Sequence, residues 1–326
     1  MRLWIVLISL VLGLWTGACF ADKPAILVIE SYHDGYPWDK SYKKALQEYL
    51  GKEYQLNYFE MDTKRLPKSL YEKRADLAWK KYQELKPVLV VLGDDNALNY
   101  LGPKLIETST PVVYLGINNN PRDYIPLGRN ITGVLERPLL KRAIVDIRRT
   151  YPNTESVLVL FDSGTTSQAS SQEVFQGRSE IKLLGLKISL KFIGDWSVWQ
   201  ETVLEANKHY DVMVIGLYHT LIDDEGLHVP AEKVIRWTSE HTPIPPFAFW
   251  DFEVGADKAL GGMVLSGYEQ GKEAAAIARE ILAGKAPSRI SPRTAEKGYY
   301  LFSRTQLKKW RTNLPASIVS KAKFVD

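Results

Sequence analysis

The sequence predicts an α/β fold of two Rossmann-like lobes with parallel sheets. Short apolar runs of strand length alternate with segments of helical period, a pattern typical of parallel strands joined by right-handed crossovers. The strands fall into two groups of about five, which fits two sheets better than one very wide sheet. Six of the runs end at polar or aromatic clusters. Because ligands bind outside the carboxyl ends of parallel strands, this pattern indicates a small-molecule crevice.

The apolar runs define the predicted strands. The first group comprises residues 25–30, 55–60, 88–92, 111–115 and 131–135, and the second comprises residues 157–161, 187–193, 212–216 and 245–250. The two groups of runs predict one sheet in each of two similar lobes.

Helix signals lie between these strands. Asp39 is a candidate N-cap for one helix, and Ser69 with Glu72 forms a capping box for the next. The run 269–285 has helical period, and Gly284 suits the position just after a helix C-terminus. The order of strand, helix and strand is therefore the one that the predicted fold requires.

The first 21 residues have the order of a secretory signal peptide. Arg2 is followed by an apolar stretch over residues 3–14 and then by small residues up to Ala21. The apolar stretch is too short for a comfortable membrane span. We expect cleavage after Ala21 and export to the periplasm. In the alternative, the four residues ending at Cys19 form a lipoprotein box that anchors the protein to a membrane, although Thr16 stands where Leu is usual.

Charge and cysteine content exclude several classes of protein. The first 21 residues contain one basic residue, Arg2, and no acidic one, so the rest of the chain has 41 basic and 38 acidic residues. The charges are interspersed on helical stretches, so we expect no nucleic-acid partner. Cys19 is the only cysteine and the chain has five histidines. We therefore expect no disulfide, no metal site and no cofactor.

Signatures of catalysis and of dinucleotide binding are missing from the sequence. No G-x-G-x-x-G follows the first strand, and the chain has no G-x-S-x-G elbow, H-E-x-x-H or P-loop. His33 with Asp34, or His219 with Asp223 and Asp224, would be the candidate base and orienting acid of a hydrolase. Residues so close in a chain seldom face each other, and we predict that the protein is not an enzyme.

Three segments carry a resemblance to a known family. They are PVVYLGINNNP (111–121) followed by NITGVLERP (130–138), GGMVLSGYEQGKEAAAIAREILAGKAP (261–287), and LFSRTQLKKWRTNLPASIVSKA (301–322). In order and spacing they resemble the solute-binding proteins of ABC transporters with the type 1 periplasmic binding protein fold, in the subfamily linked to tryptophan or tyrosine uptake. The resemblance covers essentially the whole mature chain.

The resemblance implies two lobes joined by three crossover strands that close on a ligand. The chain would cross near Glu136, again at Trp250 to Glu253, and again between Pro287 and Thr294. The implied lobes are an N-terminal lobe of residues 22–135 plus 252–288 and a C-terminal lobe of residues 136–251 plus 289–326. A ligand would stabilise the closed form through the better contacts that it makes there.

Candidate ligand-binding residues of the first lobe follow three predicted strands. They are Ser31, Tyr32, His33, Tyr36, Trp38, Asp94, Asp95, Asn118 and Asn119. The aromatic rings can stack on a flat ligand or pack their loop onto the next helix. The two aspartates precede Asn96, and this group can hold a ligand ammonium or cap a helix. The two asparagines of the set either form a turn or contact the ligand.

Candidates in the second lobe also stand at strand ends. They are Asp162, Thr165, Tyr218, His219, Trp250 and Asp251. The segment with Asp162 and Thr165 offers hydroxyls and backbone N–H groups at a helix start, which suits a ligand carboxylate or phosphate, or serves simply as an N-cap. Trp250 is large enough to be a core residue. Asp251 after an apolar strand is harder to explain by packing.

These observations predict an exported solute-binding protein for an ABC importer. Its ligand would be a small polar molecule with an aromatic or amino-acid-like part, its partner an ABC permease, and its own state a monomer. The loop at 31–38 and Asn118 to Asn120 depart from the family pattern, so the ligand does not follow from the resemblance. Such loops also resemble periplasmic sensing regions, and the alternative is a sensor that regulates a membrane histidine kinase or diguanylate cyclase.

Overall fold

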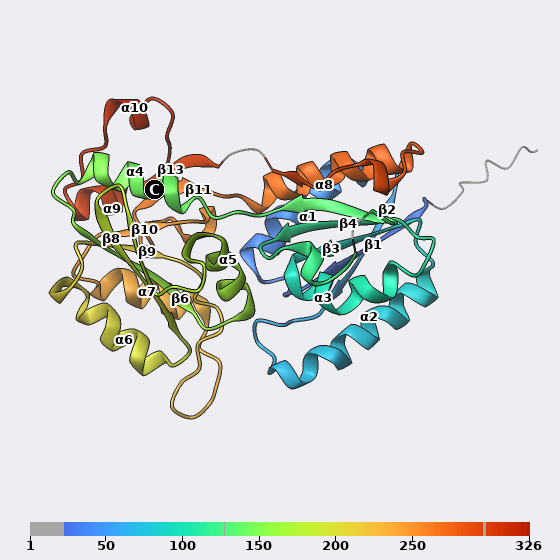
Figure 1. The fold of residues 1–326 in the computed structure, drawn as a ribbon, viewed down its shortest axis with the longest axis horizontal. Coiled ribbons are helices and arrows are strands. Elements are labelled where there is room, and N and C mark those ends of the chain that lie inside the picture. Colours follow the sequence, from blue (N-terminus) through green and yellow to red (C-terminus); the bar gives the residue numbers. More distant parts are fainter. Residues whose placement is uncertain (1–22, 127, 296–297) are drawn as a thin grey trace, which may run out of the picture.

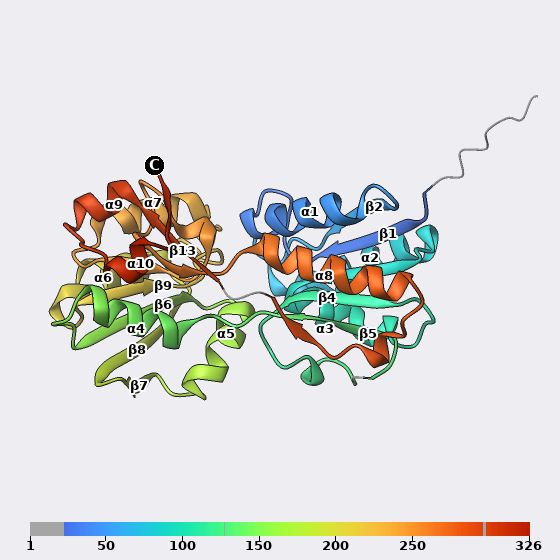
Figure 2. The same ribbon diagram turned by 90° about the horizontal axis from the view of Figure 1, so that it is seen from above.

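The computed structural model describes residues 23–126, 128–295 and 298–326 and has two α/β lobes along its long axis (Figures 1 and 2). The predicted α/β fold with two lobes and parallel sheets is confirmed. The predicted signal peptide and the lipoprotein alternative at Cys19 lie outside the described residues. Among the described helices, none has the length and apolar character needed to span a membrane.

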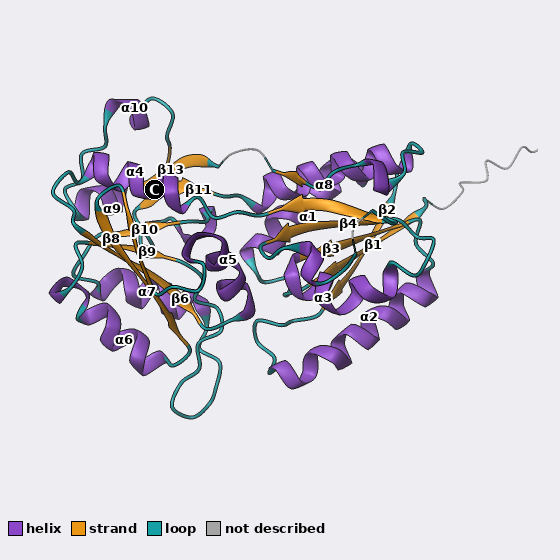
Figure 3. Cartoon of the chain, viewed as in Figure 1, coloured by secondary structure: helices purple, strands orange, loops and turns teal. Residues whose placement is uncertain are grey.

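The first lobe is built on a six-stranded sheet in which every neighbouring pair is parallel. In spatial order its strands are β12 (Arg293–Thr294), β5 (Ile131–Leu135), β4 (Val112–Ile117), β3 (Leu89–Gly93), β1 (Ala25–Glu30) and β2 (Gln55–Glu60). Helices α1 (Pro37–Leu50) and α8 (Gly267–Leu282) cover one face, and α2 (Tyr71–Leu85) and α3 (Asp94–Leu105) cover the other (Figures 1 and 3).

Burial on both faces explains why the central strands read as uninterrupted apolar runs. All residues of β3 and β4 are buried, as are the last five of β1. Val28 and Val91 pack with α1 in one cluster, while Leu27 and Val90 pack with α3 in another. Helices on both faces thus exclude water from the sheet, as in other parallel sheets.

The second lobe is built on an eight-stranded, mainly parallel sheet. Its strands in order are β14 (Lys323–Val325), β13 (Tyr299–Ser303), β11 (Gly261–Val264), β10 (Pro246–Ala248), β9 (Val212–Ile215), β6 (Ser156–Asp162), β8 (Leu186–Ile193) and β7 (Glu180–Leu183). The β7–β8 and β11–β13 pairs are antiparallel. The helices are α4 (Leu140–Thr150), α5 (Thr165–Phe175), α6 (Trp196–Leu204), α7 (Ala231–His241), α9 (Arg304–Lys309) and α10 (Ala316–Val319).

Five short 3-10 helices complete the described elements. They are η1 (Lys68–Leu70), η2 (Pro121–Asp123), η3 (Ala206–Lys208), η4 (Asp251–Glu253) and η5 (Pro287–Arg289). The last of them, η5, leads into β12, which is an edge strand of the first sheet.

All nine strands predicted from the apolar runs are present, with ends within two residues of the prediction. The sheets are wider than expected, because the apolar runs did not include β11 and β13 or the short edge strands β7, β12 and β14. The helix starts are less accurate. Helix α1 begins at Pro37, so Asp39 lies in its first turn, and Ser69 belongs to η1 ahead of α2. Gly284 follows the C-cap of α8 with φ of 102°, as predicted.

Three passages connect the two sheets. The first leaves β5 at Glu136, where it was expected. The second lies between β11 and α8, because β11 pairs with β10 and β13 in the second sheet while α8 packs on α1. This places residues 261–264 with the second sheet, although the expected boundary at residue 252 assigns them to the first lobe. The third passage follows β12, so Thr294 still lies in the first sheet.

Candidate ligand-binding site

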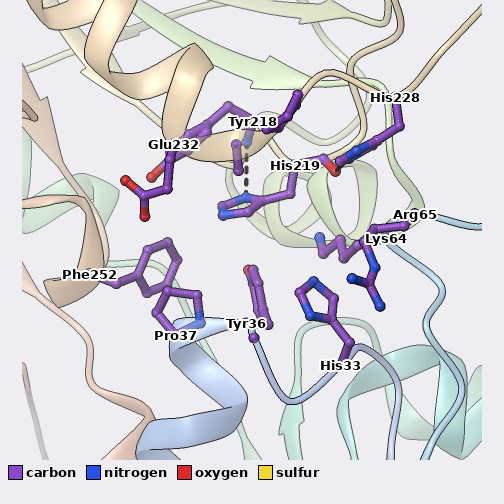
Figure 4. Close-up of a pocket in the computed structure, with 13 residues that line it drawn as sticks. His33, Tyr36, Pro37, Lys64, Arg65, Tyr218, His219, His228, Glu232 and Phe252 are labelled. Carbon is purple, nitrogen blue, oxygen red and sulfur yellow. Dashed lines mark hydrogen bonds between the residues drawn. The ribbon is translucent and has the colours of Figure 1, made fainter.

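A cavity of about 330 Å³ lies between the lobes at the carboxyl ends of the strands (Figure 4). From the first lobe it is lined by His33, Gly35, Tyr36, Pro37, Lys64 and Arg65, and from the second by Tyr218, His219, His228, Pro230, Ala231, Glu232 and Phe252. The volume is within the range of small-molecule sites. Four residues predicted from strand ends therefore share one cavity: His33, Tyr36, Tyr218 and His219.

Tyr36 is the centre of an aromatic cluster that crosses between the lobes. Its ring centroid lies 4.8 Å from that of Tyr32, 4.8 Å from that of His219 and 5.8 Å from that of Phe252. The contacts with Tyr32 and His219 are edge-to-face, a favourable geometry for aromatic pairs. The loop at 31–38 thus does more than pack onto α1, because its central ring contacts the opposite lobe.

The cavity contains two histidines whose pKa values are lowered. Burial lowers the pKa of His219 well below its usual value, and burial together with the nearby Arg65 lowers the pKa of His33. The backbone N–H of Tyr218 donates to Nδ1 of His219 at 3.4 Å, which leaves the proton of the neutral ring on Nε2. Neutral imidazoles offer a donor and an acceptor without charge, so both rings suit a polar ligand.

A narrower space lies deeper between the lobes. It measures only about 10 Å³ and is lined by Tyr32, Tyr36, Trp38, Asp94, Asn118, Glu136, Thr166, Leu217, Trp250 and Phe252. The protein's own side chains therefore fill the centre of the cleft, and the larger cavity adjoins it through Tyr36 and Phe252.

Direct hydrogen bonds hold the lobes together across this centre. The hydroxyls of Tyr32 and Thr166 lie 2.8 Å apart, and Ser170 Oγ donates to Asn118 Oδ1 at 2.8 Å. Trp250 is a buried core residue at 2% exposure, and it also lies in the cleft, because its Nε1 donates to Glu136 across the lobes. The described conformation is therefore closed.

The two predicted aspartates of the first lobe have different environments. Asp95 accepts hydrogen bonds from the backbone N–H groups of Asn118 and Asn119, both at 3.0 Å, and so shapes the turn after β4. Asp94 has φ of 67°, a strained conformation for a residue other than glycine. Its Oδ2 is buried and has no hydrogen-bond partner among the described residues. Asp95 thus has a structural role, while Asp94 faces the deep cleft.

Several predicted residues use their polar groups within their own lobe. Asp162 accepts from the backbone N–H groups of Gly164, His219 and Thr220 and from the Ser167 hydroxyl. Its carboxylate is fully occupied in organising the loops of the second lobe.

Ser31 also serves its own lobe. Its hydroxyl donates to the carbonyl of Gly93 at 2.5 Å and accepts from the N–H of Ala97 at 2.8 Å. Asn96 does not cap α3, which has Gly93 as its N-cap, and instead donates to Thr63.

Thr165 and Asp251 do not line the cavity or the deep cleft. Thr165 is exposed, and the next residue, Thr166, contacts the first lobe instead. Asp251 accepts a hydrogen bond from Tyr299 at 3.2 Å. Consecutive residues of a helix point in different directions, so Thr166 faces the cleft while Thr165 faces solvent. A pattern of polar residues at a strand end does not distinguish the two.

The sequence interpretation missed Lys64, Thr166, His228 and Phe252, which line the cavity or the deep cleft. A signal for Lys64 was present, since it follows β2 at the carboxyl end of a parallel strand, the criterion that was applied to six other strands.

A second cavity, of about 610 Å³, lies beside the turn after β4. Its lining includes Asn118, Asn119 and Arg137 of the first lobe side and Ala169 and Gln172 of α5. Arg137 donates to the carbonyls of Ile117 and Asn118, so its charge is used to brace this turn.

The chain belongs to the ABC transporter substrate binding protein family, which matches residues 105–325. Among solved structures it is similar to an ABC domain in complex with L-Trp from Streptococcus pneumoniae, with a TM-score of 0.72, 16% identity, and coverage of 94% of this chain and 100% of that one. A conserved domain protein from Vibrio cholerae has a TM-score of 0.71, 16% identity and the same coverages.

The ligand-free, open structure of a substrate binding protein with adhesive properties from Clostridium difficile has a TM-score of 0.63 and 14% identity, covering 93% of this chain and 99% of that one. These likenesses show a shared type 1 periplasmic binding protein fold. No curated protein matches the sequence of this chain.

Proposed function

We propose that this protein is exported to the periplasm and captures a small polar ligand with an aromatic or amino-acid-like part for an ABC importer. The cavity of about 330 Å³ between the lobes supports this proposal, because rings from both lobes line it. A ligand held there touches both lobes at once and therefore favours the closed form. Binding and release would occur without chemical conversion, and the chain would act as a monomer that delivers its ligand to a permease.

The family membership of residues 105–325 favours delivery to a transporter over the sensing alternative. The tryptophan-type subfamily remains part of the proposal. L-tryptophan is the first compound to test, since the neighbour from Streptococcus pneumoniae is in complex with L-Trp.

Native mass spectrometry of the protein purified from its own periplasm tests the proposal. We expect the wild type to carry an added small-molecule mass, which is identified after denaturation. Calorimetric titration with L-tryptophan, the first candidate, tests binding directly. Tyr36→Ala removes the central ring of the cavity and is expected to lose the added mass. Tyr58→Ala is the matched control, because Tyr58 is an exposed tyrosine outside the cavity lining. Equal occupancy in wild type and Tyr36→Ala, or no retained mass and no binding, contradicts the proposal.

A further inference from the structure

Lys64 is a buried cation that faces the cavity. Its side chain is 6% exposed, and it lies among the rings of His33, Tyr36 and His219 (Figure 4). Its Nζ lies 4.6 Å from the ring centroid of Tyr32 and 5.7 Å from that of Tyr36. Cation–π contacts of this kind offset only part of the cost of removing an ammonium from water.

Within the described ranges, no carboxylate lies within ion-pair distance of Lys64. Burial lowers the pKa of the Lys64 ammonium, and Asp162 and Asp94 oppose part of this shift by attracting its charge from farther away. The carboxylate of Asp162 is already occupied by four donors of its own lobe. A buried charge without a partner is rare in folded proteins unless a metal or ligand pairs with it.

The other charged groups of the cavity are already paired. Arg65 donates to both carboxylate oxygens of Asp62, at 2.7 and 2.8 Å. Glu232 lies at the exposed rim and pairs with Lys258 at 3.4 Å. Among the described residues, Lys64 is thus the one Lys, Arg, Asp or Glu of the cavity lining without an ion-pair partner.

The shape of the cavity adds a second requirement. Tyr36, His219 and Phe252 form a group of rings with centroids 4.8 to 5.8 Å apart, and Pro37 and Pro230 add further flat apolar surface. Flat surfaces favour a planar ligand, since such a ligand buries the most apolar area against them.

We propose that the ligand of this cavity is a small organic acid with a planar ring, whose single anionic group pairs with Lys64. This inference rests on the proposed function and narrows its ligand class. One ammonium neutralises one negative charge, so a ring carboxylate fits better than a dianion, and a ring amine is rejected. Specificity comes from the unpaired cation, because a neutral or cationic analogue leaves Lys64 buried and uncompensated.

The test compares acids and amines that share a ring. Phenylpropionate with phenethylamine, imidazolepropionate with histamine, and indolepropionate with tryptamine are titrated into the full mature chain by calorimetry, with thermal unfolding as a second readout. We expect at least one acid to bind and its matched amine to fail. Lys64→Gln should lower the affinity for that acid by about tenfold or more, while Lys64→Arg should retain part of the affinity.

Lys40→Gln is the control, because it removes the same charge at an exposed position of α1 outside the cavity. Ligand-free Lys64→Gln should unfold at a temperature no lower than the wild type, since it removes an uncompensated buried charge. Amines that bind as well as acids, an acid that binds Lys64→Gln as tightly as wild type, or failure of every acid overturns the inference. If native mass spectrometry still shows another retained small molecule, the proposed function survives this failure; if it shows none, both fail.

Discussion

At the residue scale, Glu136 joins the two lobes through its carboxyl group. Trp250 Nε1 donates to its Oε1 at 2.5 Å, and Asn118 Nδ2 donates to its Oε2 at 3.3 Å. Burial raises the pKa of Glu136 to about 8, and the hydrogen bond from Trp250 opposes part of this shift. Desolvation is the larger effect, although the positive charge of the neighbouring Arg137 also lowers the pKa.

The raised pKa predicts a pH dependence of stability. The pKa of Glu136 is about 8 in the folded protein, whereas the ordinary pKa of a glutamate is 4.5. Its contribution to the free energy of unfolding is therefore fully present below the ordinary pKa and is lost as the pH rises through the folded pKa. We expect the wild type to lose stability relative to Glu136→Gln across this window, measured by urea unfolding at several pH values. Glu225→Gln, at an exposed position, should leave the pH profile unchanged. Parallel profiles for wild type and Glu136→Gln would contradict the assignment.

At the element scale, the contact between α1 and α8 sets the position of the cleft loop. A Cβ on Gly271 would lie 2.4 Å from the backbone oxygen of Tyr42, and one on Gly267 would lie 2.6 Å from that of Trp38. Only glycine permits this approach of the two helices. Trp38 belongs to α1 and lines the deep cleft, so the packing of α8 against α1 helps to fix the position of Trp38 there.

We predict that Gly271→Ala destabilises the protein by about 1–2 kcal/mol, because the clash with backbone atoms outweighs a gain in helix propensity of about 1 kcal/mol. Chemical unfolding measures the change. Ala276→Ser on the exposed face of α8 is the control and should stay within about 0.5 kcal/mol of wild type. A neutral or stabilising Gly271→Ala would show that the helices can separate at little cost.

At the scale of the whole molecule, one buried cluster runs through both lobes. It includes Tyr32 and Trp38 of the first lobe and Phe161 and Trp250 of the second. Two further hydroxyl contacts, from Thr166 to Tyr32 and from Ser170 to Asn118, close the lobes directly. The closed form is therefore stabilised in part by contacts that need no ligand.

Removing both hydroxyl contacts should open the ligand-free protein. The double variant Thr166→Val and Ser170→Ala loses two hydrogen bonds of roughly 0.5–1.5 kcal/mol each. Together they shift the balance between closed and open forms by roughly five-fold to a hundred-fold. Small-angle scattering should show a larger radius of gyration than for wild type. Ser171→Ala is the control, because Ser171 donates to Gln168 within α5. An unchanged radius in the double variant would mean that other contacts determine closure.

The sequence by itself determined the two sheets and their central strands, because strands buried on both faces, such as β3 and β4, must be apolar throughout. It also placed Tyr36 and His219 at strand ends, where the fold brings them to one cavity. Only the tertiary structure decided which polar groups face a ligand. Asp162 and Lys64 both lie at the carboxyl ends of parallel strands, yet Asp162 is occupied by four donors and Lys64 has no ion-pair partner among the described residues. The difference is not visible in the sequence, because two of the donors to Asp162, the backbone N–H groups of His219 and Thr220, come from a loop distant in the chain.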